Sequence, residues 1–251
     1  MQSNGAAIKD GTYEQGLLGI LGAYLSSRYE RTEDMHDLEA AIKCAEWLEV
    51  TPQDHPDRVA RLNNLGGHLS SRYEQTGVMH DLEAAIRSAE EGVEATPVDD
   101  PDRATQLSNL SVHLSRRHER TRDINDVEAA IKSAEAAVVA TPEDHPDRAR
   151  RLHNLGNCLS SRYARTGDMH DLEAAIRSTA EAVEATPVDH PDRAGRLSNL
   201  GNSLSSRYER TGDMHDLEAA IKSAEEAVEA TPVDHPDRAG WLSNLGIHLS
   251  S

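Results

Sequence analysis

The chain has 251 residues, of which 44 are acidic and 26 are basic, and its formal net charge is −18 with neutral histidines. This balance argues against nucleic acid as a partner, because an acidic surface repels phosphate backbones. The sequence contains neither a signal-peptide core nor an apolar run of about 20 residues, so it predicts a cytoplasmic protein with no membrane segment.

Residues 1–10 are predicted to be a polar lead-in, and the rest of the chain is repetitive. A proline recurs every 45 residues, at Pro52, Pro97, Pro142, Pro187 and Pro232. The predicted repeats are 11–55, 56–100, 101–145, 146–190 and 191–235, followed by a terminal helix at 236–251. The repeats 146–190 and 191–235 differ at only seven positions. Self-similarity at this period is typical of a solenoid, so the repeats are expected to form one array.

Each repeat is predicted to hold two helices. In repeat 191–235, Pro191 and Asp192 favour the start of the first helix. Gly212 supplies its end, and Asp213 is a suitable N-cap for the second helix, which ends before Pro232. One apolar stripe on each helix predicts a shared core, from Leu197, Leu200, Leu204 and Tyr208 on the first helix and Leu217, Ala220, Ile221, Ala224 and Val228 on the second.

Two of the turns between paired helices depart from this pattern. Val78 stands where other repeats carry the capping aspartate, and Arg122 stands where others carry the glycine. These two turns are expected to be softer than the others, because a cap or a favourable backbone residue is missing.

The spacing Leu197-x2-Leu200-Gly201-x2-Leu204, followed by Ala220-x3-Ala224, Ala227 and Pro232, resembles the tetratricopeptide repeat. The chain departs from that family in its 45-residue period and in having Leu at the large aromatic positions. It is similar to the long repeats of kinesin light chains and to arrays in fungal and bacterial NOD-like receptor and CHAT-domain proteins. The resemblance implies an all-α, right-handed superhelical solenoid of antiparallel helix pairs. A HEAT-type array has a similar period, but the Gly-Ala-Pro spacing favours the tetratricopeptide reading.

The repeats differ most on one predicted face of the first helix, which the resemblance implies lines a concave peptide-binding groove. Asn157 and Asn202 lie in one of these variable rows. From the second repeat onward, one position on this side is always asparagine, at Asn64, Asn109, Asn154, Asn199 and Asn244. A ladder of amides can pair with the main chain of a bound peptide. The alternative is that each amide bonds to a neighbouring repeat.

Non-repeated basic residues are expected near the middle of this groove. Arg116, Arg150 and His153 are placed in the groove, with Arg151 and Arg196 at its edge. We expect this group to favour an acidic peptide, or one read through its backbone, over a basic peptide. Ion pairs between repeats are the alternative explanation for these arginines.

No pattern in the sequence indicates catalysis. Eight of the 13 histidines occupy recurring turn positions without zinc-site spacing, and there is no Gly-rich phosphate loop. The two cysteines, Cys44 and Cys158, lie in different repeats and are expected to stay reduced. We therefore expect a non-enzymatic protein with no metal or cofactor that binds a protein or peptide. The alternative function is a structural array that self-associates through its ends.

Overall fold

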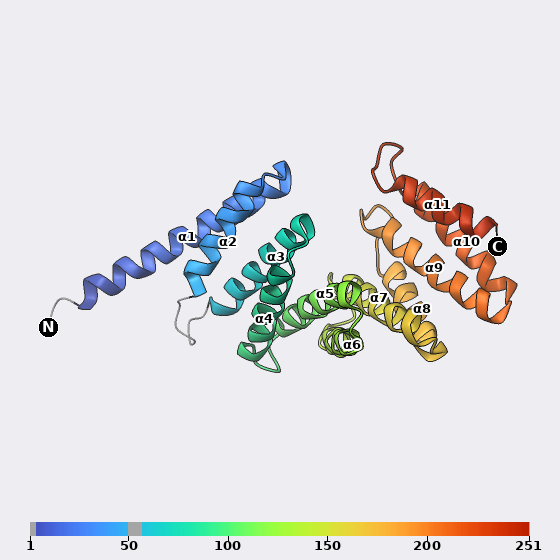
Figure 1. The fold of residues 1–251 in the computed structure, drawn as a ribbon, viewed down its shortest axis with the longest axis horizontal. Coiled ribbons are helices and arrows are strands. Elements are labelled where there is room, and N and C mark those ends of the chain that lie inside the picture. Colours follow the sequence, from blue (N-terminus) through green and yellow to red (C-terminus); the bar gives the residue numbers. More distant parts are fainter. Residues whose placement is uncertain (1–3, 50–56, 251) are drawn as a thin grey trace. The chain divides into compact units, whose positions relative to one another are not determined.

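A computed structural model describes residues 4–49 and 57–250, and for residues 4–15, 48 and 49 it describes the backbone alone (Figure 1). The helices are α1 (Asn4–Thr32), α2 (Met35–Glu49), α3 (Arg58–Thr76), α4 (Met79–Ala95), α5 (Arg103–Thr121), α6 (Ile124–Val139), α7 (Arg148–Thr166), α8 (Met169–Glu184), α9 (Arg193–Thr211), α10 (Met214–Glu229) and α11 (Arg238–Leu249). The chain forms two compact units, Met1–His113 and Leu114–Ser251, and α5 contributes to both.

The predicted all-α fold of successive helix pairs is confirmed within each unit. All regular structure in the described ranges is helical, and the helices alternate between a first and a second helix of each repeat (Figure 1). The segment expected to be a polar lead-in is helical from Asn4 onward, because α1 extends well before the start of the other first helices. Pro52 and His55, in the predicted first repeat, lie outside the described residues.

The helix boundaries follow from the turn residues. Gly212 adopts the left-handed conformation with φ 71°, and Asp213 Oδ1 accepts a hydrogen bond from His215 N, as predicted. The first helix begins at Arg193, two residues after Pro191, which the sequence placed in its first turn. Pro191 therefore precedes the helix, and Asp192 serves as an N-cap without a side-chain capping bond.

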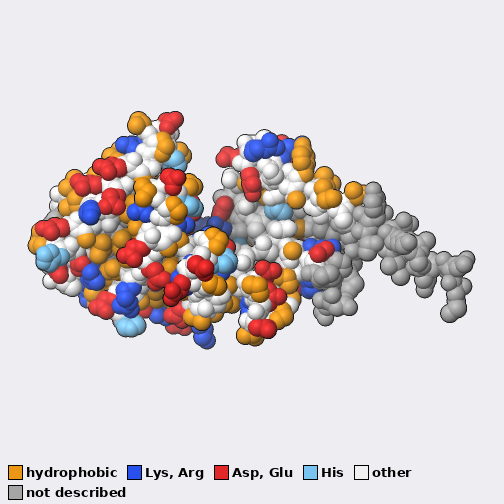
Figure 2. Space-filling model, turned by 180° about the vertical axis from the view of Figure 1, so that it is seen from behind, with side chains coloured by type: hydrophobic (Ala, Val, Ile, Leu, Met, Phe, Trp, Pro, Cys, Tyr) orange, Lys and Arg blue, Asp and Glu red, His pale blue; other side chains and the backbone are white. Residues whose placement is uncertain are grey.

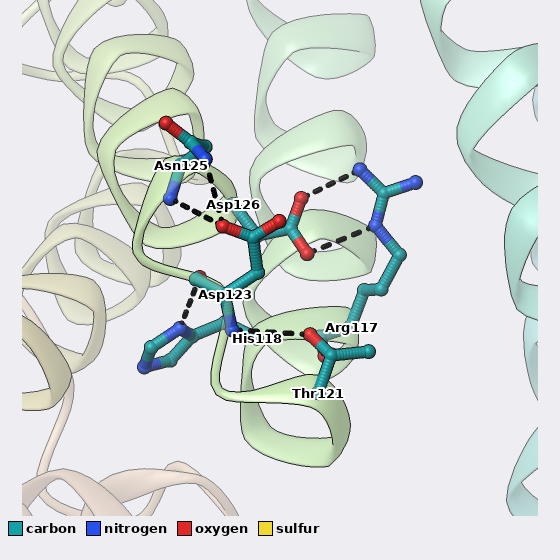
Figure 3. Close-up of polar contacts among 6 residues, drawn as sticks. All are labelled: Arg117, His118, Thr121, Asp123, Asn125 and Asp126. Atoms are coloured by element: carbon teal, nitrogen blue, oxygen red, sulfur yellow. Dashed lines mark hydrogen bonds and ion pairs between the residues drawn. The ribbon is translucent and has the colours of Figure 1, made fainter.

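The two unusual turns keep the same backbone path. Arg122 adopts φ 61°, which costs a residue with a Cβ roughly 1–2 kcal/mol. In this repeat His118 Nδ1 donates to the carbonyl of Asp123 at 2.6 Å, which ties the end of α5 to the turn (Figure 3). Val78 makes no capping bond.

A buried arginine–aspartate pair joins the two helices of each repeat. Arg117 on α5 makes a bidentate ion pair with Asp126 in the first turn of α6, at 3.0 and 2.5 Å (Figure 3). The same pair recurs as Arg28–Asp37, Arg72–Asp81, Arg162–Asp171 and Arg207–Asp216. The aspartates are buried, so this pair fixes how the first helix meets the second.

A second set of arginines joins successive repeats. Arg193, the first residue of α9, donates to the carbonyl of Val183 at 3.0 Å and to that of Thr186 at 2.6 Å. These carbonyls lie at the carboxyl end of α8, where backbone oxygens have no partner within the helix. Arg238 makes the same contacts with the end of α10.

The core consists of leucines interleaved with alanines. Leu172, Ile176, Leu204 and Ala220 form one buried cluster between the pairs α7–α8 and α9–α10. Val183, Ala194, Leu197 and Ala227 form the next cluster, against which Trp241 packs. The helices approach closely where a glycine faces the paired helix, since a Cβ on Gly201 would lie 3.2 Å from the carbonyl oxygen of Ala220.

Candidate functional site: the first-helix face

The variable face of the first helices is only partly exposed. Gly67 and Asn202 are exposed, but Ser108 and Ser198 in another variable row are buried. The variable rows therefore include buried as well as exposed positions, because a first helix packs against neighbouring repeats as well as against its own second helix. By contrast, Glu218, Glu225 and Glu229 on α10 are exposed, and we call the surface that they form the outer face.

The invariant asparagines bond to neighbouring first helices. Asn199 Nδ2 donates to Asn157 Oδ1 at 2.9 Å, and Asn244 Nδ2 donates to Ser198 Oγ at 2.9 Å. Asn109 donates to Asn63 in the same way. The alternative prediction therefore holds for these three residues. Each amide retains its carbonyl oxygen and a second N–H, so the bonds leave acceptor and donor capacity on the same side chain.

Three predicted site residues meet in one cavity of about 380 Å³ between α7 and α9, which we call the asparagine cavity. Asn157, Asn199 and Asn202 line it together with the Ser203 and Ser206 side chains. Its walls carry amides and hydroxyls from two adjacent repeats, together with Glu119 of α5 and the apolar side chains of Ala164 and Leu172. The amides and hydroxyls donate and accept hydrogen bonds, which is the chemistry that a peptide main chain requires.

A second cavity, of about 650 Å³, lies where α7, α9 and α11 begin, and we call it the tryptophan cavity. Arg150 and His153 reach it from α7, and Arg196 lines it from α9. Trp241 of α11 completes the wall. Sequence reasoning missed Trp241, although it replaces an arginine or glutamine found in the other first helices from α3 onward.

The two arginines expected at the groove edge are buried. Arg151 and Arg196 are only 3% and 5% exposed, and each donates through Nη1 to a threonine at the end of the preceding second helix, Thr141 or Thr186. Arg196 also pairs with Asp192 at 3.0 Å. These two arginines therefore join repeats through hydrogen bonds to threonine, and not through the ion pairs between repeats that were the alternative, since their aspartate partners lie in the same repeat.

The tryptophan cavity contains a neutral imidazole. Burial, with the charge of Arg196 as a second cause, lowers the pKa of His153 to about 4. Asn157 Nδ2 lies 3.1 Å from His153 Nε2. Because Asn157 uses its oxygen to accept from Asn199, it presents its N–H group to the ring, which assigns the imidazole proton to Nδ1.

The remaining predicted residues lie elsewhere. Arg116 and Asn154 are partly buried on α5 and α7, outside the lining of both cavities. Asn64 on α3 lines a larger cavity of about 740 Å³ in the amino-terminal unit, formed with the glycine-rich side of α1.

Basic and acidic side chains are mixed on the surface of the carboxyl-terminal unit. On the face in Figure 2, red acidic side chains and blue basic ones lie among one another. On this face neither charge forms a continuous patch.

The described residues show no cluster of metal-ligating side chains. Within that part of the chain no helix is long and apolar enough to cross a membrane. Cys44 and Cys158 are free and buried, and burial raises the pKa of the Cys158 thiol to about 11. This thiol is therefore protonated at neutral pH and is a weak nucleophile.

Comparison with known proteins agrees with this architecture. The tetratricopeptide repeat model matches residues 148–192 and 193–237. No curated protein matches the chain significantly.

Solved structures resemble most of the chain. A putative kinesin light chain of Podosopora anserina, with nearly identical TPR-like repeats, aligns with a TM-score of 0.58 at 16% identity over 83% of this chain and 95% of its own. A thermophilic TPR protein of Thermus thermophilus aligns with a TM-score of 0.57 at 21% identity over 92% and 98%. MamA protein aligns with a TM-score of 0.57 at 16% identity over 88% and 98%. At these identities the likeness establishes the fold alone.

Proposed function

Residues 148–237 are two tetratricopeptide repeats, and from this premise we propose that the chain is a non-catalytic array that binds a protein or peptide through its first helices. Repeat arrays commonly use the face lined by one set of helices to bind partners. The observation that carries the proposal is that the asparagine and tryptophan cavities both open between first helices and are lined by residues in which the repeats differ.

The polar walls support recognition of an extended segment. Asn157, Asn199 and Asn202 offer amides to a main chain, while the serine hydroxyls around them can donate or accept. The exposed side of the second helices carries many glutamates with basic residues such as Lys222 among them, which suits solvation rather than selective contact.

The test is a lysate pull-down with three proteins. The first-helix variant carries Gly67→Gln and Asn202→Arg, since both positions are exposed and a Cβ on Gly67 meets nothing within 4 Å. The outer-face control carries Glu218→Gln and Glu225→Gln. Circular dichroism first establishes that all three have the same helix content.

The proposal expects a partner that the parent and the outer-face control capture and that the first-helix variant loses. Loss from the outer-face control with retention by the first-helix variant would overturn it. Neither variant alters the tryptophan cavity, so this test is independent of that site.

A second candidate is self-association through the ends of the array. Leu17, Ile20 and Trp47 on α1 and α2 are 50%, 70% and 73% exposed. On α11, Leu242 and Leu249 are also exposed, whereas the equivalent residues of α9, Leu197 and Leu204, are buried. Exposed apolar groups of this kind favour association. Light scattering that gives a monomer mass at every concentration would rule this candidate out.

A further inference from the structure

The tryptophan cavity is built by residues that the other repeats do not share. Arg150 corresponds to Gly195 in the next repeat, and His153 corresponds to Ser198. Trp241 corresponds to Arg196. Three departures from a near-identical repeat thus line one cavity, although they lie on α7 and α11. Convergence of unique residues is what distinguishes a site from a repeated packing feature.

Three residues that line this cavity each carry a buried hydrogen-bond donor without a partner. Arg196 Nε, His153 Nδ1 and Trp241 Nε1 are buried and have no hydrogen-bond partner among the described residues. With the imidazole proton on Nδ1, all three atoms are donors. A buried donor without an acceptor destabilises a protein by about 1–3 kcal/mol, so a ligand that brings oxygen acceptors gains that energy on binding.

The guanidinium of Arg150 can exchange its present ion-pair partner for a ligand. Arg150 pairs with Asp147 at 3.5 Å, and the two side chains are 39% and 42% exposed. Such an exposed pair contributes little and is easily replaced by another carboxylate. Arg196, in contrast, is held by Asp192 and Thr186. Arg150 is therefore the guanidinium best able to turn toward a ligand.

Part of the remaining wall is apolar. Ala194, Pro191, Pro232 and the indole of Trp241 form this part, and His190, Thr231 and His235 also line the cavity. A Cβ on Gly195 meets nothing within 4 Å, which shows that the glycine leaves space where Arg150 stands in the preceding repeat. Apolar walls around buried donors match a carboxylate on a short hydrocarbon stem.

Three aspartates at the cavity disfavour the binding of a strongly charged anion. Asp189, Asp192 and Asp237 also line the cavity, on exposed links before α9 and α11. Asp192 is already paired with Arg196. The other two disfavour a doubly charged phosphate more than a single carboxylate, and they make a cationic ligand the competing possibility.

We propose that the tryptophan cavity is a subsite for one acidic side chain, glutamate or aspartate, of a bound peptide. The proposal rests on the peptide-binding function above and assigns it a chemical preference. Arg150 pairs with the carboxylate, the buried indole and imidazole N–H groups donate to its oxygens, and the proline and alanine side chains contact its methylene stem.

The test follows the two indole N–H signals in a proton–nitrogen correlation spectrum. Trp241 reports on the cavity, and Trp47, on α2 in the other unit, is an internal reference. The probe is acetyl-Ala-Leu-Glu-Leu-Ala-amide. Matched peptides carry Gln or Lys at the centre, and acetyl-Ala-Leu-Leu with a free carboxyl terminus presents a carboxylate without the stem.

The Glu peptide is expected to move the Trp241 signal and leave that of Trp47 in place. Arg150→Gln should weaken this response about tenfold or more, as expected when a charged hydrogen bond is lost. Arg116→Gln, which removes the same charge outside the cavity, should leave it unchanged. Gly195→Gln, which fills the open space, should abolish it.

An equal or stronger response to the Gln or Lys peptide would overturn the proposal, as would an undiminished response in the Arg150→Gln protein. A shift of the Trp241 signal with the peptide that ends in a free carboxyl group, but not with the Glu peptide, would also overturn the proposal. It would show that the cavity binds a chain terminus and not an acidic side chain. No response from Trp241 to any peptide, with partner capture still lost on Gly67→Gln and Asn202→Arg, would reject this subsite and leave the proposed function standing.

Discussion

The arginine–aspartate pair inside each repeat is expected to be the main polar determinant of helix pairing. In Arg207–Asp216 the bonds are 2.8 and 2.5 Å, and the side chains are 31% and 9% exposed. Removing one partner of a fully buried pair destabilises a protein by about 3–5 kcal/mol. Because the guanidinium is partly solvated, we expect about 2–3 kcal/mol for Arg207→Met.

The assay is a double-mutant cycle with Arg207→Met and Asp216→Asn, measured by urea unfolding with circular dichroism. The double variant should be less destabilised than the sum of the single ones, with a coupling energy of about 2 kcal/mol. The matched control is Lys222–Glu226, an exposed pair at 3.9 Å on α10, whose coupling should stay below about 0.5 kcal/mol.

A coupling for Arg207–Asp216 no larger than that of the control would refute this reasoning. Unfolding of a repeat array need not be two-state, so the slope of the urea transition is compared among all variants. Hydrogen exchange in α9 and α10 provides the local measure, and the loss of protection should be greatest in that repeat.

Three further results are expected from single substitutions. Arg122→Gly should raise the free energy of unfolding by about 0.5–1 kcal/mol, because glycine relieves the left-handed backbone but adds freedom to the unfolded chain; an unchanged urea midpoint would contradict this. The pKa of His153 in the folded protein lies below its pKa in the unfolded chain. As the pH is lowered, the unfolded state therefore binds the proton first, and the free energy of unfolding should decrease between about pH 6.5 and pH 4. His153→Ser should remove up to about 3 kcal/mol of that pH dependence, measured as the difference between the two stability–pH curves. Gly195→Ala should stabilise the protein by about 0.5–1 kcal/mol, since its Cβ enters open space. Gly156→Ala should destabilise it by about 1–3 kcal/mol, since its Cβ would lie 2.5 Å from Thr179 Cγ2. Thermal melts in which both substitutions shift the melting temperature in the same direction would refute this reasoning.

Local features of each repeat were predictable because they depend on residues close in the chain. The 45-residue period specified paired helices, and Gly212 and Asp213 marked the turn between them. The arginine–aspartate pair was also readable in principle, since both residues recur nine positions apart in all five complete repeats. The contact joins two different helices, so the pattern of either helix alone does not indicate it.

Contacts between repeats could not be read from the sequence. Asn199 had two possible partners, a bound peptide or a neighbouring helix, and only the packing of α7 against α9 decided that it bonds to Asn157. Arg196 was predicted at an exposed edge, yet the end of α8 covers it.

The tryptophan cavity is the clearest case of a feature that the sequence does not predict. Arg150 and Trp241 are separated by two repeats, and nothing local distinguishes them from ordinary drift of surface residues. The sequence by itself determined the repeat, its helices and its core, because periodicity and turn chemistry are local. The tertiary structure alone decided which variable residues share a cavity, because that depends on how successive helices stack in space.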